Sequence, residues 1–146
     1  MYLLDTNIVS ADASTKRHVG VDAFTAWLRA NSDRIYLSAI TIAEIEAGIA
    51  RAVRIGATTK AEHLRRWLAA VEHFYAGRIL PFGIEEARHA GLMLDRARAH
   101  DPGFEDIAIA ATAAAHGFTV LTANDRHFTP LGVPFANPLK QLPVIR

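Results

Sequence analysis

Hydrophobic and polar residues alternate along this chain in two periods, which predict two kinds of element. Short apolar runs closed by polar or turn residues are typical of buried strands. We expect such strands at 2–4, 34–38, 78–82 and 118–122, with a fifth, short edge strand at 133–137. Longer segments repeat apolar residues at helical spacing, as Ile42, Ile45, Ile49 and Val53 do. These segments predict helices at 22–31, 41–54, 58–77, 84–100 and 105–116.

The order of these elements predicts the fold class. Strands separated by helices imply a parallel sheet with helices on both faces. We therefore expect an α/β domain whose central, mostly parallel sheet of four to five strands is flanked by helices. A length of 146 residues is that of one domain, so we expect a single unit over residues 1–146.

The composition narrows the possible chemistry. Hydrophobic residues make up 51% of the chain and charged residues 21%, a balance that favours a packed core over disorder. Cysteine is absent, which excludes disulfides, thiolate metal sites and cysteine nucleophiles and favours a cytoplasmic protein. The formal net charge is only +1, so contact with nucleic acid would need a local site.

No segment of the sequence predicts contact with a membrane. An acid at position 5 interrupts any early apolar region of the kind that a signal peptide needs. The most apolar later run, "IAIAATAAA", is far below the roughly 18 residues that span a bilayer. Its many alanines suit close helix packing instead.

Polar residues follow several of the predicted strands, at the end of the sheet where open α/β proteins tend to bind ligands. Asp5 directly follows the first strand, and Glu44 belongs to the helix after the second. Asp106 begins the alanine-rich helix beside Glu105, and Asn124 with Asp125 follows the fourth strand. We therefore expect acids about a hundred residues apart in sequence to share one pocket.

Carboxylates in one pocket repel each other unless a cation or shared protons offset their charge. Oxygen ligands without thiolates favour a hard cation, Mg²⁺ or Mn²⁺, and such an ion suits phosphodiester hydrolysis. Asp5 is the candidate central ligand, with Asp106 and Glu44 as ligands directly or through water and Asn124 as a neutral oxygen donor. The residues expected to support these ligands are Thr6, Asn7, Thr41, Thr122 and Asp125.

Each of these residues also has an ordinary structural interpretation. Thr41 and Glu44 fit the capping box, in which the glutamate only fixes the start of a helix. Asp106 has the position of an acid that stabilises a helix N-terminus, and Asn124-Asp125 is a common turn pair. None of the seven histidines has metal-binding spacing, so all seven are interpreted as surface or helix-capping groups.

Several motifs resemble a known family. The segments "YLLDTNIVS", "LSAITIAEIEAGI", "EDIAIAATAAAHGFTVLTAND" and "HF" are similar to those of PIN-domain proteins, specifically VapC-type toxins. The segments "AGRILPF" and "ANP" resemble the FitB subgroup. The resemblance implies a PIN-like fold and a metal-dependent ribonuclease whose acidic positions are Asp5, Glu44 and Asp106. A fourth position, often aspartate in the family, is Asn124 here, with Asp125 beside it.

The resemblance also implies partners. It predicts a homodimer and a small VapB- or FitA-like antitoxin that binds DNA with one part and blocks the acidic pocket with another. The expected function is therefore a Mg²⁺- or Mn²⁺-dependent endoribonuclease toxin, whose RNA substrate the sequence leaves open. One alternative is a PIN-like binding module without turnover. Another is a haloacid-dehalogenase-like phosphatase with Asp5 as nucleophile, although Asn7 stands where those enzymes have a second aspartate.

Overall fold

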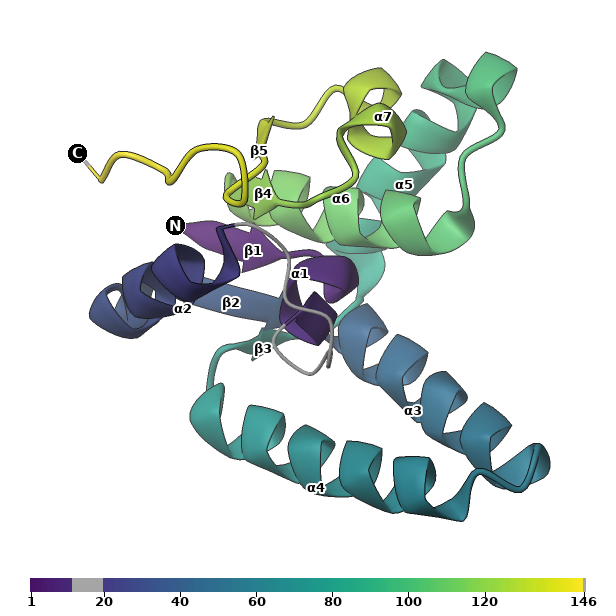
Figure 1. Ribbon diagram of the computed structural model, residues 1–146. Helices are drawn as coiled ribbons and strands as arrows, with labels where there is room; N and C mark the ends of the chain where they lie inside the picture. Colours follow the sequence, from purple (N-terminus) through teal and green to yellow (C-terminus); the bar gives the residue numbers. More distant parts are fainter. Residues whose placement is uncertain (12–19, 146) are drawn as a thin grey trace.

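The computed structural model describes residues 1–11 and 20–145, and five parallel strands form its centre (Figure 1). The strand order across the sheet is β3-β2-β1-β4-β5, and every neighbouring pair is parallel. This arrangement confirms the predicted α/β fold. The strands are β1 (Tyr2–Leu4), β2 (Ile35–Ser38), β3 (Ile79–Leu80), β4 (Thr119–Leu121) and β5 (Phe135–Ala136).

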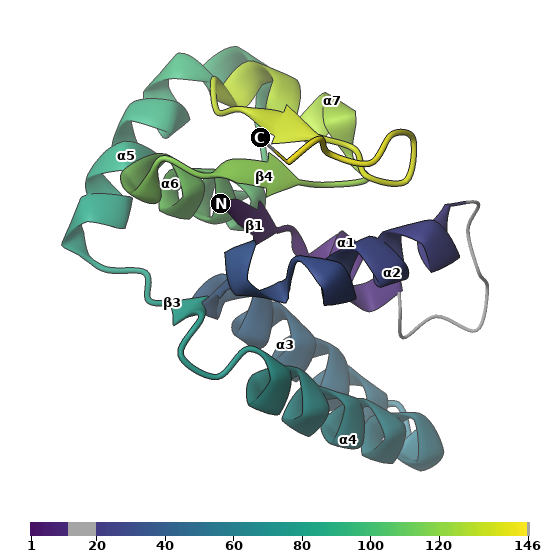
Figure 2. The same cartoon turned by 90° about the vertical axis from the view of Figure 1, so that its left-hand side faces the viewer.

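Alternating side chains on the two central strands supply both faces of the sheet with core residues. Leu3 and Val120 pack in the cluster that contains residues of α5 (Ile84–Arg96) and α6 (Phe104–His116). Leu4 and Leu121, their neighbours in sequence, pack on the opposite face with residues of α1 (Thr6–Ala11), α2 (Val21–Ala30) and α4 (Thr58–Phe74). The fold is therefore layered, with helices on both faces of the sheet (Figures 1 and 2).

The predicted helices are present, with small shifts at their ends. The helix expected at 84–100 ends at Arg96, and a separate 3₁₀ turn covers Arg98–His100. A four-residue helix after β4, which the apolar pattern is too short to reveal, carries His127. The helices are α1 (Thr6–Ala11), α2 (Val21–Ala30), α3 (Ala39–Arg54), α4 (Thr58–Phe74), α5 (Ile84–Arg96), α6 (Phe104–His116) and α7 (Asp125–Phe128).

The helix pair α3 and α4 and the single helix α6 have distinct roles. Helices α3 and α4 run side by side away from the sheet (Figures 1 and 2), joined by a small apolar cluster around Ile45, Ile49 and Leu68. Helix α6 lies against the sheet, and every residue from Ile107 to Ala113 is buried. Its alanines allow this close approach, which fixes the position of the α6 N-terminus. No helix within the described ranges is long and apolar enough to span a membrane.

Candidate active site at the carboxyl edge of the sheet

The centre of the sheet is a topological switch point. Strand β1 lies between β2 and β4, so the connections after β1 and β4 diverge and leave a crevice beyond their carboxyl ends. Asp5 directly follows β1, and Thr122 directly follows β4. The backbone N–H of Asp5 donates to the carbonyl of Leu121 (2.9 Å), which extends the sheet to this edge.

The carboxylate of Asp5 is only 4% exposed and is held at both oxygens. The backbone N–H of Thr6 donates to Oδ1, and the hydroxyl of Thr122 donates to Oδ2; both distances are 2.8 Å. The Thr122 hydroxyl also accepts from the backbone N–H of Asn124 (2.9 Å). These bonds fix the orientation of Asp5 and still leave a lone pair on each oxygen for a further partner.

Glu44 takes no part in capping a helix. Helix α3 begins at Ala39, and its cap is Ser38, whose hydroxyl accepts from the Ile40 N–H (3.1 Å). Glu44 Oε1 instead accepts from the Thr6 hydroxyl (2.8 Å), which lies 3.0 Å from the hydroxyl of Thr41. The capping-box interpretation of Thr41 and Glu44 is therefore wrong, and Glu44 is connected to the residue next to Asp5.

This assignment predicts opposite effects for two substitutions near the start of α3. Ser38→Ala removes the cap and is expected to lower the free energy of unfolding by about 1 kcal/mol. Glu44→Gln removes no cap and relieves the burial and repulsion that raise the pKa of Glu44, so its melting temperature in EDTA at neutral pH should equal or exceed that of the parent. Thermal unfolding followed by circular dichroism measures both. A drop for Glu44→Gln as large as that for Ser38→Ala would restore the capping role.

The N-terminus of α6 brings two more acids to the same place. Asp106 is in the first turn of α6, next to Glu105, where the positive end of the helix favours a carboxylate. Asp106 Oδ2 lies 2.7 Å from His127 Nδ1, and the same nitrogen lies 2.8 Å from the amide of Asn124. Residues after β4 are thereby joined to the start of α6.

The acids are close enough to affect each other's protonation. Burial, followed by the charges of Asp106 and Glu44, raises the pKa of Asp5 to about 6, although bonds from Thr122 and Thr6 oppose the shift. Burial also raises the pKa of Glu44, with further contributions from the charges of Glu105 and Asp106. Mutual destabilisation of this kind marks a site that is built for a cation or a shared proton.

Most of the site residues predicted from the sequence line one cleft of about 360 Å³. Thr41 and Thr122 support it from behind through their hydrogen bonds, and Asn7 Oδ1 accepts from the Ala123 N–H (3.3 Å). Asp125 lies outside the cleft, because Asn137 and Lys140 hold its carboxylate. The lining residues are Asp5, Thr6, Asn7, Ser10, Glu44, Glu105, Asp106, Asn124 and His127.

Ser10 and His127 line the cleft but are not among the site residues predicted from the sequence. Each lies at helical spacing from a predicted residue: Ser10 is four positions after Thr6, and His127 is three positions after Asn124. In a helix these spacings place side chains on one face. The signal was present in the sequence, but the helical turns that contain it are too short to recognise from apolar periodicity.

The donor set fits a hard divalent cation. Its candidate ligands are carboxylate oxygens, and burial together with the neighbouring charges of Asp106 and Glu44 raises the pKa of Asp5, which a bound cation would offset. Among the residues that the structure describes, no three acidic, histidine or cysteine side chains are arranged as a ready-made metal cage. Mg²⁺ does not require one, because it usually keeps several waters and takes only one or two carboxylates together with substrate phosphates.

Comparison with known proteins identifies the fold family. The family described as "PIN domain" matches the chain over residues 2–132. The chain belongs to the PIN-domain family. Among PIN-domain relatives, VapC ribonuclease Y4jK of Sinorhizobium fredii is 36% identical over 143 residues, covering 94% of this chain and 97% of the relative. Toxin FitB of Neisseria gonorrhoeae is 34% identical over 141 residues, covering 94% and 98% respectively.

A solved structure supports the same assignment. A crystal structure of FitAcB from Neisseria gonorrhoeae matches this PIN domain with a TM-score of 0.80 at 34% identity, covering 94% of this chain and 98% of that chain. The resemblance to VapC-type proteins and to the FitB subgroup is therefore confirmed. The alternative of a haloacid-dehalogenase-like phosphatase is excluded at the level of the fold family.

Proposed function

We propose that this PIN-domain protein is a Mg²⁺- or Mn²⁺-dependent endoribonuclease that acts as the toxin of a type II toxin–antitoxin pair. The observation that supports this most directly is the meeting of Asp5, Glu44 and Asp106 in one cleft at the switch point of the sheet. Two relatives that match nearly the whole chain are named a VapC ribonuclease and a FitB toxin. The substrate is an RNA phosphodiester.

In this proposal the side chains bind and orient rather than react. Asp5, fixed by Thr6 and Thr122, offers the central ligand oxygens, and Asp106 and Glu44 offer theirs from α6 and α3. The bound ion would supply an activated water and offset charge on the phosphoryl group. Asn124 contributes a neutral amide beside Asp106, so it can hold a water without adding charge.

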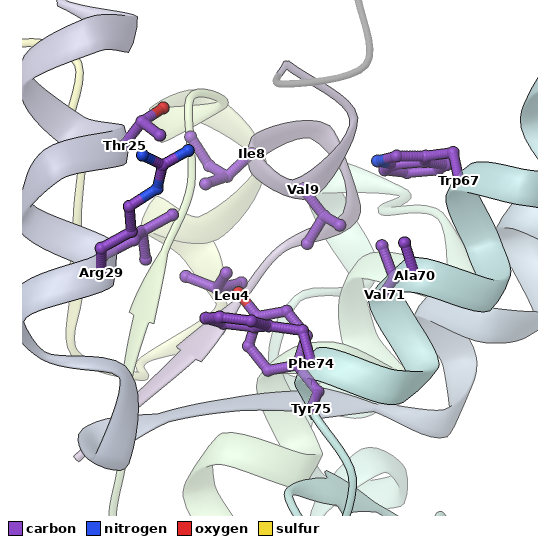
Figure 3. Close-up of a pocket in the computed structure, with 11 residues that line it drawn as sticks. Leu4, Ile8, Val9, Thr25, Arg29, Trp67, Ala70, Val71, Phe74 and Tyr75 are labelled. Carbon is purple, nitrogen blue, oxygen red and sulfur yellow. The ribbon is translucent and has the colours of Figure 1, made fainter.

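A second surface suits the proposed antitoxin. A groove of about 290 Å³ lies between α1, α2 and α4 (Figure 3), and its lining is mostly apolar. Val9 and Trp67 line it, and Phe74 is 45% exposed at its wall. An apolar segment of the antitoxin would bury these side chains. Exposed apolar grooves of this kind commonly receive one face of an amphipathic helix.

The groove and the acidic cleft are neighbours, because α1 contributes to both. Ile8 and Val9 line the groove, whereas Thr6, Asn7 and Ser10 line the cleft. An antitoxin segment in the groove can therefore extend a cationic side chain across α1 to pair with the acids. In this proposal the protein is a cytoplasmic homodimer, and it contacts DNA only through the antitoxin.

The direct test is cleavage of RNA by the purified protein. We expect cuts in total cellular RNA and in structured single-stranded substrates when Mg²⁺ or Mn²⁺ is present, and none in EDTA, because the acids repel the phosphate without a cation. Co-expression with a short DNA-binding protein encoded beside the gene should suppress both cleavage and growth arrest. Denaturing gels and growth curves measure the two effects.

Three results would contradict all or part of the proposal. A folded protein that binds no Mn²⁺ and cuts none of these RNAs would favour a binding module without turnover. Cleavage that persists in EDTA would leave the RNase activity but remove the metal from it. Trapping a phosphorylated Asp5 would point to covalent chemistry instead.

A further inference from the structure

Among the described residues that line the cleft, His127 is the one histidine, and it contacts a proposed ligand directly. Its Nδ1 lies 2.7 Å from Asp106 Oδ2, and its side chain is 55% exposed against 21% for Asp106. The sequence grouped His127 with six surface or capping histidines. The contact with Asp106 gives it a role that no other histidine in the described part of the chain shares.

The helical turn that carries His127 is anchored on its other side. Phe128 is fully buried in the core, and the carboxylate of Asp125 is bound by Lys140 Nζ (2.7 Å) and Asn137 Nδ2 (3.0 Å). The His127 N–H donates to the Asn124 carbonyl (3.1 Å), which closes the turn. These anchors aim Asn124 and His127 into the cleft and hold them there.

The protons on the imidazole can be assigned from its neighbours. Nδ1 carries either one hydrogen or one lone pair, so it cannot both donate to Asp106 and accept from Asn124. A carboxylate only accepts, so we assign Nδ1–H as the donor to Asp106 Oδ2. Asn124 Nδ2 lies 2.8 Å from the same nitrogen, and this assignment requires the amide to be flipped so that its oxygen faces the ring. Within the described residues no other hydrogen bond uses the Asp106 carboxylate, so Oδ1 remains free.

We propose that His127 is a positioning residue for Asp106, holding Oδ2 so that the free oxygen is kept for the divalent cation. The inference rests on the proposed function of the cleft. A side chain with several rotamers loses conformational entropy when it binds an ion, and the imidazole bond removes part of that loss beforehand. Partners that hold a ligand carboxylate in this way typically change metal affinity by 10–100-fold.

The test measures Mn²⁺ binding without RNA, by electron paramagnetic resonance titration of the intact protein. His127→Ala should weaken Mn²⁺ affinity by about tenfold. His127→Asn should keep most of the affinity, because its amide nitrogen occupies the place of Nδ1 and can donate to Asp106. The matched control is His63→Ala, an exposed position on α4 outside the cleft, which should bind Mn²⁺ like the parent.

Two further readings separate positioning from a general loss of structure. The melting temperature of His127→Ala should equal that of His63→Ala, and its RNA cleavage should recover at saturating Mn²⁺. Unchanged affinity in His127→Ala would overturn the inference, and so would tighter binding, which would make the imidazole a competitor of the cation. If the parent protein itself binds no Mn²⁺, the proposed function fails and this inference fails with it; any other failure concerns His127 alone.

Discussion

Asp5→Asn is expected to abolish RNA cleavage while the protein stays folded. The substitution keeps the shape of the side chain but replaces one carboxylate oxygen with an NH₂ group, which cannot bind a cation, and it removes the negative charge. Supporting residues around a metal typically contribute 10–100-fold, so loss of the central ligand should reduce the cleavage rate by more than about 100-fold. Expression of Asp5→Asn should also leave cell growth unaffected. Initial rates on a defined RNA and growth curves measure the two effects.

The control for this prediction is Asp95→Asn, which makes the same chemical change at an exposed residue of α5 whose carboxylate lies 3.6 Å from Arg98, outside the cleft lining. It should cut RNA and arrest growth like the parent. Circular dichroism must show the same fold for both variants. Normal cleavage by a folded Asp5→Asn protein would remove Asp5 from the proposed mechanism, whatever the behaviour of Glu44 and Asp106.

The sequence predicted the sheet well because its signals are local. Strand β1 has the bounds Tyr2–Leu4 that its apolar run predicts, since the run stops at a carboxylate. Asp5, Glu44 and Asp106 could be nominated because each stands near the carboxyl end of a strand or at a helix start. Parallel strands bring those ends to one edge, so topology alone predicts that the three side chains meet.

The sequence could not predict which side chains of the short turn after β4 face the cleft, because that depends on their directions within the turn. Asn124, Asp125 and His127 are close in sequence, yet Asp125 turns toward Lys140 and Asn137 while the other two face the cleft. The direction of the Asp125 side chain depends on Asn137 and Lys140, which follow β5. The sequence alone does not place that segment beside Asp125. Asp125 therefore does not line the cleft, but its bonds to Asn137 and Lys140 anchor the turn that carries Asn124 and His127. The sequence analysis did not identify His127, which does reach the cleft.

The same burial that prepares Asp5 for a cation should make the cation-free protein less stable as the pH rises. In the folded protein the pKa of Asp5 is raised from 3.8 to about 6, so the folded state binds its proton more tightly than the unfolded state does. Its stabilising contribution is complete below about pH 4 and is lost as the pH rises through about 6. A shift of this size corresponds to roughly 3 kcal/mol.

Asp5→Asn removes that pH dependence and provides its measurement. In EDTA at pH 7.5 the variant should be more stable than the parent by up to about 3 kcal/mol, a rise of several degrees in melting temperature, and the two should converge near pH 4. The lowered pKa values of Glu86 and Asp125 occur in both proteins and cancel in the difference. The charges of Glu44 and Asp5 repel each other, so a neutral residue 5 also relieves Glu44 and adds to the stability of the variant. Urea unfolding at a series of pH values measures the difference directly.

Added Mn²⁺ should narrow the difference between the two proteins. At about a hundred times its dissociation constant, Mn²⁺ should raise the free energy of unfolding of the parent by roughly 2.7 kcal/mol and that of the variant by much less. Equal stability of parent and variant at pH 7.5 in EDTA would mean that the ionised Asp5 carboxylate does not destabilise the cation-free protein. The electrostatic argument for a cation at this site would then be wrong.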